Sequence, residues 1–176
     1  MNSVIILGLP GSGKSTYGKK LAEKLGTIHI SFGELYREMK EKKELEEYKG
    51  KKLDEILLGR LMELVNPSEM EWIVIDGPNI AHFELINNLF PIRRTINMNY
   101  DFSNNEERKL IIERMLKRAR NDDENEEMII KRIIIKDVLY RKNKFMLNKF
   151  IKCHKKRNNL IFEEISAFCN LDEIKF

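Results

Sequence analysis

The fold of this chain is decided near its start by the stretch Gly8-Leu9-Pro10-Gly11-Ser12-Gly13-Lys14-Ser15. This stretch matches the pattern of a phosphate-binding loop, in which glycine N–H groups surround a β-phosphate without a Cβ in the way. The β-branched run Ser3–Leu7 precedes it and a helical pattern, Lys14–Leu25, follows it. A glycine-rich turn with an incidental lysine is the alternative, and the strand–loop–helix context argues against it. The residues therefore predict nucleotide binding, without choosing among the classes of P-loop protein.

The expected contacts with ATP lie in this loop and in the first turn of the helix after it. Lys14 can bridge oxygens of the β- and γ-phosphates, and the Ser15 hydroxyl can ligate Mg²⁺. The helix N-terminus adds a partial positive charge at the same place. The full set of expected ATP-binding residues is Gly11, Ser12, Gly13, Lys14, Ser15 and Thr16.

Short apolar runs alternate with helical patterns along the rest of the chain. Further strands are predicted at 27–30, 72–76, 95–100 and 160–165, and helices at 33–42, 53–65, 81–89, 105–119 and 126–150, with a closing turn at 171–174. Strands that alternate with helices favour a parallel sheet with right-handed crossovers. The expected fold class is therefore α/β, a five-stranded parallel sheet flanked by helices, in one domain over residues 1–176.

Length and composition limit the other functions that the chain could have. A chain of 176 residues is long enough for one α/β domain and short for two. The formal net charge of +4 is too small to indicate a nucleic-acid partner. Cys153 and Cys169 form no Cys-x-x-Cys pair, so no zinc site is implied. No targeting segment and no apolar stretch of about 20 residues is evident, so we expect a cytoplasmic monomer with no membrane partner.

Four further segments resemble the adenylate kinase family, in the family's own order. The first is His29-Ile30-Ser31-Phe32-Gly33-Glu34-Leu35-Tyr36-Arg37, which is similar to the family's H-I-S-T-G-D-x-L-R. The resemblance implies that Ser31, Gly33 and Arg37 bind the acceptor nucleotide, within an acceptor insertion over residues 31–66. Phe32 departs from the family pattern because it replaces a threonine beside the acceptor.

The second segment, Asp76-Gly77-Pro78-Asn79, resembles the family's D-G-F-P-R with one residue lost. The resemblance implies that Asp76 helps to hold Mg²⁺ through water, and that Gly77 and Asn79 lie beside the acceptor. The family's arginine that clamps the acceptor phosphate is missing, and Asn79 stands nearest its place. The glutamine that reads adenine in the family also has no counterpart. Arg60 and Arg93 are the candidates to replace the missing cation.

The third segment, 114–123 with Arg132 further on, resembles the family's lid. The fourth, 160–173, resembles its final strand and capping helix. Residues 118–126 correspond to a short lid. The resemblance implies that lid arginines converge with Lys14 on the transferring phosphoryl group, giving the catalytic set Lys14, Arg114, Arg118, Arg120 and Arg132. The alternative for each arginine is a solvent-facing residue of a long helix, paired with Glu113 or Glu127.

The function that the resemblance implies is transfer of the γ-phosphoryl group of ATP, with Mg²⁺, to a nucleoside monophosphate. Two alternatives stay open because the acceptor segment departs from the family pattern. One is a P-loop kinase with a different small-molecule acceptor, and the other is a catalytically weak relative that acts as an assembly partner. The basic run 141–157 is interpreted as the solvated face of an amphipathic helix rather than a nucleic-acid surface. His29 and His154 are interpreted as structural or surface residues.

Overall fold

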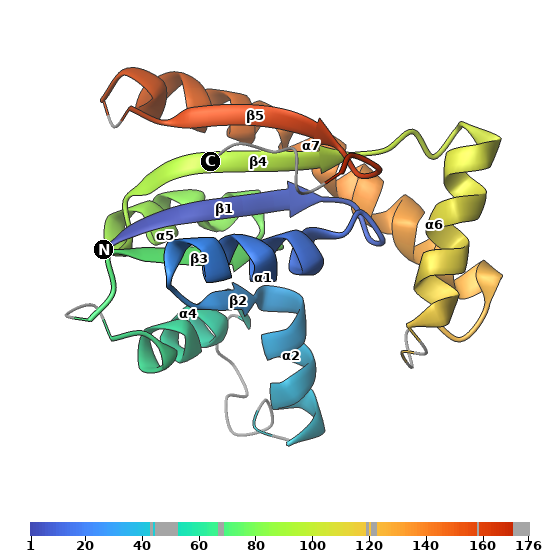
Figure 1. The fold of residues 1–176 in the computed structure, drawn as a ribbon, viewed down its shortest axis with the longest axis horizontal. Helices are drawn as coiled ribbons and strands as arrows, with labels where there is room; N and C mark the ends of the chain where they lie inside the picture. Colours follow the sequence, from blue (N-terminus) through green and yellow to red (C-terminus); the bar gives the residue numbers. More distant parts are fainter. Residues whose placement is uncertain are drawn as a thin grey trace.

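The fold is an α/β arrangement built on a parallel sheet in the order β2-β3-β1-β4-β5. It is described here from a computed structural model, which describes residues 1–42, 44, 53–66, 69–118, 120, 123–157 and 159–170, without the side chains of residues 53 and 54. The elements in chain order are β1 (Asn2–Gly8), α1 (Lys14–Leu25), β2 (His29–Ser31), α2 (Phe32–Glu41), α4 (Leu53–Leu64), β3 (Trp72–Asp76), η1 (Ile80–His82), α5 (Phe83–Leu89), β4 (Ile92–Asn99), α6 (Asn105–Lys117), α7 (Glu126–Arg157) and β5 (Ile161–Ser166). The predicted fold class, a five-stranded parallel sheet flanked by helices, is confirmed (Figure 1).

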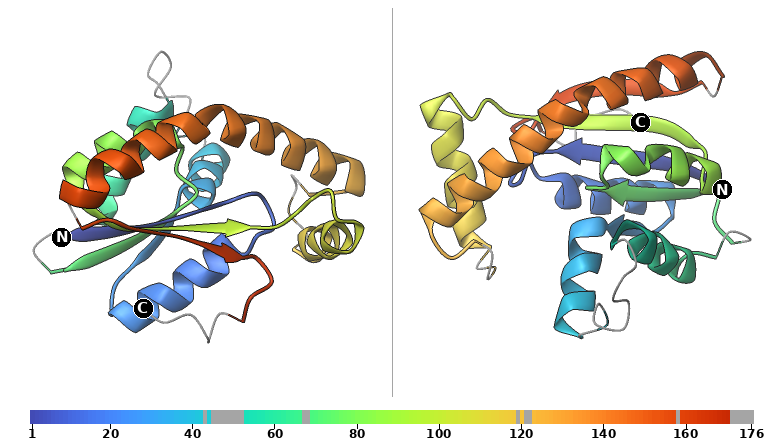
Figure 2. Two further views of the ribbon diagram at one scale, coloured as in Figure 1. Left: turned by 90° about the horizontal axis from the view of Figure 1, so that it is seen from above. Right: turned by 180° about the vertical axis from the view of Figure 1, so that it is seen from behind.

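Strand β1 forms the centre of the molecule because both of its faces are covered. Val4 and Ile6 pack with Tyr17 and Leu21 of α1 on one side of the sheet. Ile5 belongs to the larger core on the other side, which includes buried residues of α4, α5 and α7. Figure 2 shows this division, with α1 on one side of the sheet and α7 on the other. A strand buried on both faces reads as a continuous apolar run, which is why β1 was predictable.

Several element boundaries differ from the predicted ones. Strand β4 begins at Ile92, three residues before the predicted start. The prediction missed these residues because the polar side chains of Arg93 and Arg94 hide the strand pattern. Arg94 donates to Glu163 of β5 and lies largely buried between the strands. Helix α7 continues to Arg157, seven residues beyond its predicted end. The predicted closing turn at 171–174 lies outside the described residues, as do parts of the acceptor insertion and of the lid.

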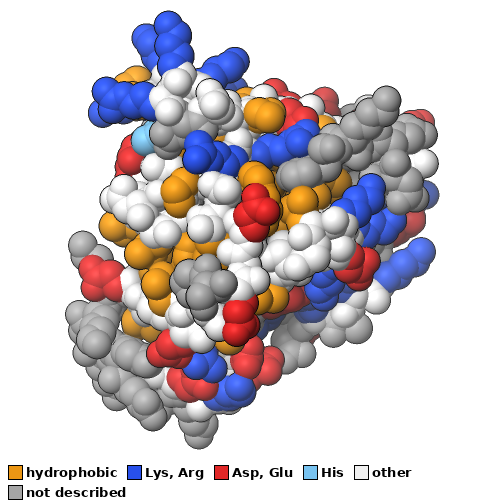
Figure 3. All heavy atoms as spheres, turned by 60° about the vertical axis from the view of Figure 1, so that its left-hand side comes forward, with side chains coloured by type: hydrophobic (Ala, Val, Ile, Leu, Met, Phe, Trp, Pro, Cys, Tyr) orange, Lys and Arg blue, Asp and Glu red, His pale blue; other side chains and the backbone are white. Residues whose placement is uncertain are grey.

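The basic end of α7 is amphipathic, as the sequence suggested, but its apolar residues divide between two faces. Leu147 and Phe150 are buried, whereas Phe145 and Met146 are exposed. Lys and Arg side chains project from the upper part of the molecule in Figure 3, at the height where α7 ends in Figure 1. None of the helices in the described part of the chain is long and apolar enough to cross a membrane.

The carboxyl ends of all the strands meet at one edge of the sheet because the strands are parallel. The phosphate-binding loop follows β1 there, and Ser31 and Asp76 end β2 and β3. Helix α2 lies to one side of this edge and helix α6 to the other (Figure 1). Ligands of open α/β sheets bind beyond the carboxyl ends of the strands, so this edge is the place to examine for a site.

Candidate active site

The loop after β1 has the backbone conformation of a phosphate-binding loop. Gly8, Gly11 and Gly13 all have positive φ, at 144°, 82° and 88°. A Cβ on Gly8 would lie 2.5 Å from the carbonyl oxygen of Met98, and one on Gly11 would lie 2.8 Å from Ile111 of α6. The Ser12 hydroxyl is buried and has no hydrogen-bond partner among the described residues. All three glycines are therefore required by conformation, and Gly8 and Gly11 also by the close packing of β4 and α6 against the loop.

Lys14 lies in the first turn of α1, and its ammonium group turns back into the loop. Its Nζ donates to the Leu9 carbonyl oxygen at 2.8 Å. Burial, together with the positive charges of Arg118, Arg132 and Lys136, lowers the pKa of Lys14 to about 8, although the negative charge of Asp76 opposes this shift. A cation that is destabilised in this way gains strongly from an anionic ligand, so the surroundings of Lys14 favour phosphate binding.

Asp76, the last residue of β3, is buried and engaged through both carboxylate oxygens. His29 Nε2 lies 2.7 Å from Oδ2, and the Ser31 hydroxyl donates to Oδ1 at 3.1 Å. The His29 ring also lies directly against α1, because a Cβ on Gly18 would come within 2.4 Å of it. His29 is thus a structural residue, as interpreted, with a specific contact that the sequence did not reveal. It fixes the carboxylate that was assigned to Mg²⁺.

Two of the predicted arginines meet at one buried carboxylate. Arg132 NH1 donates to Asp123 Oδ1 at 2.5 Å, and Arg118 NH2 donates to Oδ2 at 3.2 Å. The side chain of Asp123 is fully buried, whereas those of Arg118 and Arg132 are 34% and 25% exposed. This Arg118–Asp123–Arg132 cluster joins the end of α6 to the beginning of α7, and both arginines influence Lys14. It presents two guanidinium groups near the phosphate-binding loop.

The other two predicted arginines have different surroundings. Arg114 donates to the Ala167 carbonyl oxygen at 3.2 Å, and its guanidinium lies 4.7 Å from the centre of the Phe168 ring. It therefore faces the turn after β5 rather than the cluster. Arg120 NH2 lies 3.5 Å from Glu34 Oε1 of α2, which links the lid to the acceptor insertion. The functional assignments of Arg114 and Arg120 stay predictions.

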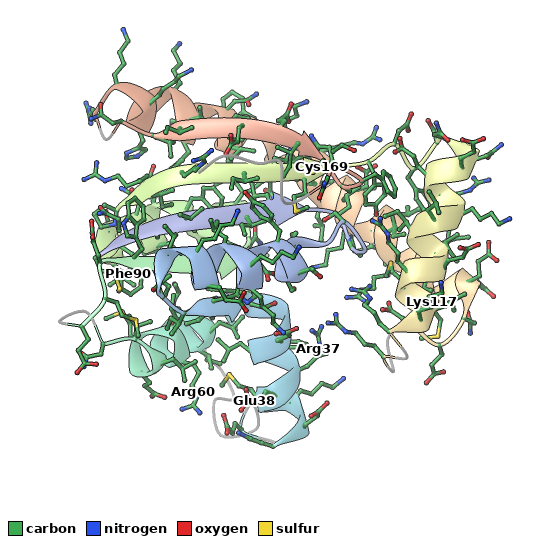
Figure 4. All side chains as sticks on the ribbon, viewed as in Figure 1. Arg37, Glu38, Arg60, Phe90, Lys117 and Cys169 are labelled. Atoms are coloured by element: carbon green, nitrogen blue, oxygen red, sulfur yellow. The ribbon has the colours of Figure 1, made fainter. Side chains whose placement is uncertain are left out.

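The expected acceptor residues lie at the end of β2, on α2 and after β3. A Cβ on Gly33 would lie 3.6 Å from NH1 of Arg37, so these two residues are adjacent on α2, and Arg37 projects on the side of α6 (Figure 4). Asn79 caps η1, because its side-chain oxygen accepts from Ala81 N at 3.1 Å. Gly77, with φ of 69°, makes the turn between Asp76 and Asn79.

Neither arginine suggested as a replacement cation lies beside Asn79. Arg93 is the second residue of β4, at the amino end of the sheet, where it donates to Asn2 at 2.9 Å, so it lies at the opposite edge from Asp76. Arg60 is on α4, pairs with Glu63 at 2.6 Å and borders a pocket of about 380 Å³ between α2 and α4. In Figure 4 it lies near Glu38 and away from the gap between Arg37 and α6.

Two further contacts at this edge were not found from the sequence. The Tyr100 hydroxyl, at the end of β4, donates to the Pro10 carbonyl oxygen at 2.6 Å and so braces the loop. Lys136 of α7 is close enough to influence the pKa of Lys14. The helical spacing of Arg132 and Lys136 was a signal that could have found the lysine, because residues four apart share a helix face.

Comparison with known proteins agrees with this arrangement. A family model described as an AAA domain matches residues 7–131. The adenylate kinase of Phocaeicola vulgatus is 31% identical over 150 residues, which cover 77% of this chain and 78% of that enzyme. The chain belongs to the adenylate kinase family. The adenylate kinase of Campylobacter hominis is 29% identical over 147 residues, 75% of this chain and 74% of that enzyme.

Identity to this family is higher over a shorter stretch. The adenylate kinase of Thermotoga neapolitana is 48% identical over 69 residues, which are 38% of this chain and 30% of that enzyme. The match with this relative therefore spans under a third of its length. Membership of the adenylate kinase family rests on the longer matches, and the site residues rest on the geometry described above.

Proposed function

We propose that this chain is a nucleoside monophosphate kinase that transfers the γ-phosphoryl group of ATP to a nucleoside monophosphate. The observation that carries the proposal lies at one edge of the sheet. Asp76 and the two arginines of the Arg118–Asp123–Arg132 cluster are close enough to Lys14 to shift its pKa. Phosphoryl transfer depends mainly on positioning and on neutralising charge. An acceptor phosphate is already ionised, so the site needs no general base.

On the donor side, the backbone of Gly11, Ser12 and Gly13 with Lys14 would bind the phosphates of ATP, and Thr16 would lie beside them. The Ser15 hydroxyl and the Asp76 carboxylate are oxygen donors, which suit Mg²⁺. Among the described residues there is no cluster of three His, Cys, Asp or Glu side chains that could hold a metal ion. Mg²⁺ is commonly bound by one or two protein oxygens together with phosphates. When bound, Mg²⁺ would neutralise phosphate charge.

On the transfer side, Arg118 and Arg132 would stabilise the transferring phosphoryl group. They belong to the short lid over 118–126 and to the helix after it, so movement of the lid would bring charge and exclude water together. Arg114 and Arg120 complete the proposed catalytic set. The acceptor would bind against the insertion over 31–66, through Ser31, Gly33 and Arg37, with Gly77 and Asn79 beside it.

A second candidate function is favoured by one observation at the acceptor side. The side chain of Asn79 is used to cap η1 and accepts from Asn143 at 3.5 Å as well, and it cannot supply the planar fork with which an arginine binds phosphate. A P-loop kinase with another small-molecule acceptor is consistent with this site. A catalytically weak nucleotide-binding relative is consistent with it too.

Turnover of ATP against each common nucleoside monophosphate tests the proposal. We expect one monophosphate to be converted to its diphosphate. Lys14→Ala should abolish transfer, and Arg118→Ala should lower kcat about 10²-fold with a smaller change in nucleotide affinity. A protein that binds ATP but phosphorylates none of the monophosphates would contradict the proposal and favour one of the other candidates.

A further inference from the structure

Lys136 occupies an unusual place on α7, the helix that crosses the sheet. Tyr140 and Leu147 pack on the core beside the sheet, and Ile133, one turn before Lys136, packs on α6; all three are buried or half-buried. Lys136 is four residues from Tyr140 and eleven from Leu147, so it shares their face. It is nevertheless exposed. At Lys136 the inward face of α7 is therefore open to solvent, at the edge where the strands end.

Contacts on either side of Lys136 fix its level along the sheet. Tyr140 accepts a hydrogen bond from Asn97 at 2.8 Å, and Asn97 is in register with Leu7, next to the phosphate-binding loop. Helix α7 runs from the carboxyl edge back across the sheet (Figure 1). Four residues of helix are about 6 Å, so Lys136 lies about 6 Å beyond Tyr140 toward that edge, with Arg132 a further turn on.

The charge of Lys136 is available to a ligand. Among the described residues it has no hydrogen-bond or ion-pair partner, although it is close enough to lower the pKa of Lys14 together with Arg118 and Arg132. One face of α7 thus carries Arg132 toward the cluster, Lys136 above the loop and, two turns later, Asn143 against Asn79. Lys136 lies between the transfer side and the acceptor side.

From this placement we infer that Lys136 binds the phosphate of the acceptor, supplying the cation that Asn79 does not provide. The inference rests on the proposed function, because it concerns a monophosphate bound at that same site. Arg93 is at the opposite edge of the sheet, and Arg60 is on α4 beside Glu63. An inward-facing ammonium group with no protein partner matches an anionic phosphate, and the cost of holding it near Lys14 is relieved when the phosphate binds.

The experiment measures the binding of each monophosphate to the ATP-bound protein by calorimetry, and kinetics wherever turnover occurs. Lys136→Gln should weaken monophosphate binding roughly 10- to 100-fold, as expected for a hydrogen bond between charged groups. The affinity for ATP should change less than about twofold. Lys136→Arg should keep the binding. Lys131→Gln is the matched control, because Lys131 is exposed on the outward face of the same helix.

A second variant tests the substitution for the missing arginine directly. Asn79→Arg in the Lys136→Gln background should recover monophosphate affinity, with thermal melts to check that loss of the η1 cap is tolerated. Unchanged monophosphate affinity in Lys136→Gln overturns the inference. So does an effect confined to kcat or to ATP, which would make Lys136 a donor-side contact.

The same measurements separate this inference from the proposed function. Monophosphate binding that needs Lys136 without any turnover upholds the inference and contradicts the kinase. Turnover with the same KM for the monophosphate in Lys136→Gln as in the unmodified protein upholds the kinase and contradicts the inference. If no monophosphate binds the unmodified protein, both are overturned.

Discussion

At the scale of single residues, the site is governed by where charge is buried. Lys14 is half-buried in the loop, and burial of its ammonium group together with nearby cations lowers its pKa from 10.5 to about 8. Asp76 is more deeply buried, but His29 and Ser31 satisfy its two oxygens. This difference matters for the proposed kinase. A bound phosphate would stabilise the charged form of Lys14, whereas Asp76 is already held in place by its two protein partners.

The lowered pKa of Lys14 predicts how ATP binding depends on pH. Below about pH 8 the lysine of the ligand-free protein is charged and binds phosphate. Above about pH 8 the lysine must take up a proton when ATP binds, so each further pH unit should raise the Kd for ATP by a factor that approaches about tenfold. Lys14→Arg should bind more weakly but lose this dependence, because arginine stays charged. Calorimetric titrations from about pH 6.5 to about pH 9.5, on both sides of the pKa, would show it. A Kd that stays flat across this range would contradict the assignment.

The contact between His29 and Asp76 predicts matched effects of two variants on different elements. His29→Ala leaves a buried carboxylate oxygen without its partner, which should cost about 1–3 kcal/mol in the free energy of unfolding and raise the Mg²⁺ concentration needed for half-maximal activity. Gly18→Ala should raise the same Mg²⁺ requirement, because its Cβ would displace the His29 ring.

Gly59→Ala is the control for Gly18→Ala. Gly59 also lies within a helix, but a Cβ there meets no atom within 4 Å, so the change should stabilise α4 by up to about 1 kcal/mol and leave the Mg²⁺ requirement alone. Equal behaviour of the two glycine variants in Mg²⁺ titrations would show that His29 does not position Asp76.

At the scale of elements, Asp123 joins the end of α6 to the beginning of α7 within the predicted lid. Breaking a buried ion pair leaves charge without compensation, and here two guanidinium groups depend on one carboxylate. Asp123→Asn should therefore lower the free energy of unfolding by about 1–3 kcal/mol, reduced from the fully buried case because both arginines are partly exposed. It should also lower kcat, since Arg118 and Arg132 lose their orientation. Urea denaturation and steady-state kinetics measure the two effects.

Asp137→Asn is the matched control for that prediction. Asp137 pairs with Arg141 at 2.8 Å within α7, where the arginine is largely exposed. An exposed pair four residues apart on one helix contributes about 0.3–0.5 kcal/mol, so this variant should change stability little. If Asp123→Asn behaved in the same way, Asp123 would not organise the lid.

The elements also show what the sequence could and could not predict. Helix α1 and strand β3 have the predicted bounds, since a glycine with positive φ ends the first and a run of four apolar residues before Asp76 forms the second. Strand β4 was predicted too short because its arginines look like loop residues in the sequence. The pairing of Arg94 with Glu163 across the strands is evident only in the folded chain. His29 with Asp76, and Lys136 with Lys14, meet only after the chain folds, because they are separated by many residues. The motif located the loop, but the residues that adjust its charge come from tertiary packing.

At the scale of the whole molecule, the predicted acceptor insertion and the predicted lid stand on opposite sides of the strand ends. Arg120 and Glu34 make a contact between them at 3.5 Å, and Arg37 projects into the same gap (Figure 4). If the donor binds at the loop and the acceptor against α2, each ligand must order the segments that the other also contacts. The binding of ATP and of the monophosphate should therefore be coupled.

This coupling predicts the thermal stability of the doubly liganded protein. A ligand that binds only the folded state stabilises it by RT ln(1 + [L]/Kd), so the rise in Tm with ATP and the correct monophosphate together should exceed the sum of the separate rises. Glu34→Gln removes the charge that pairs with Arg120 and should reduce this excess while leaving the shift with ATP alone unchanged. Glu84→Gln, on α5 beside His154, serves as the control and should keep the full excess. Strictly additive shifts in the unmodified protein would mean that the two ligands do not share the lid, and the proposed arrangement of donor and acceptor would be wrong.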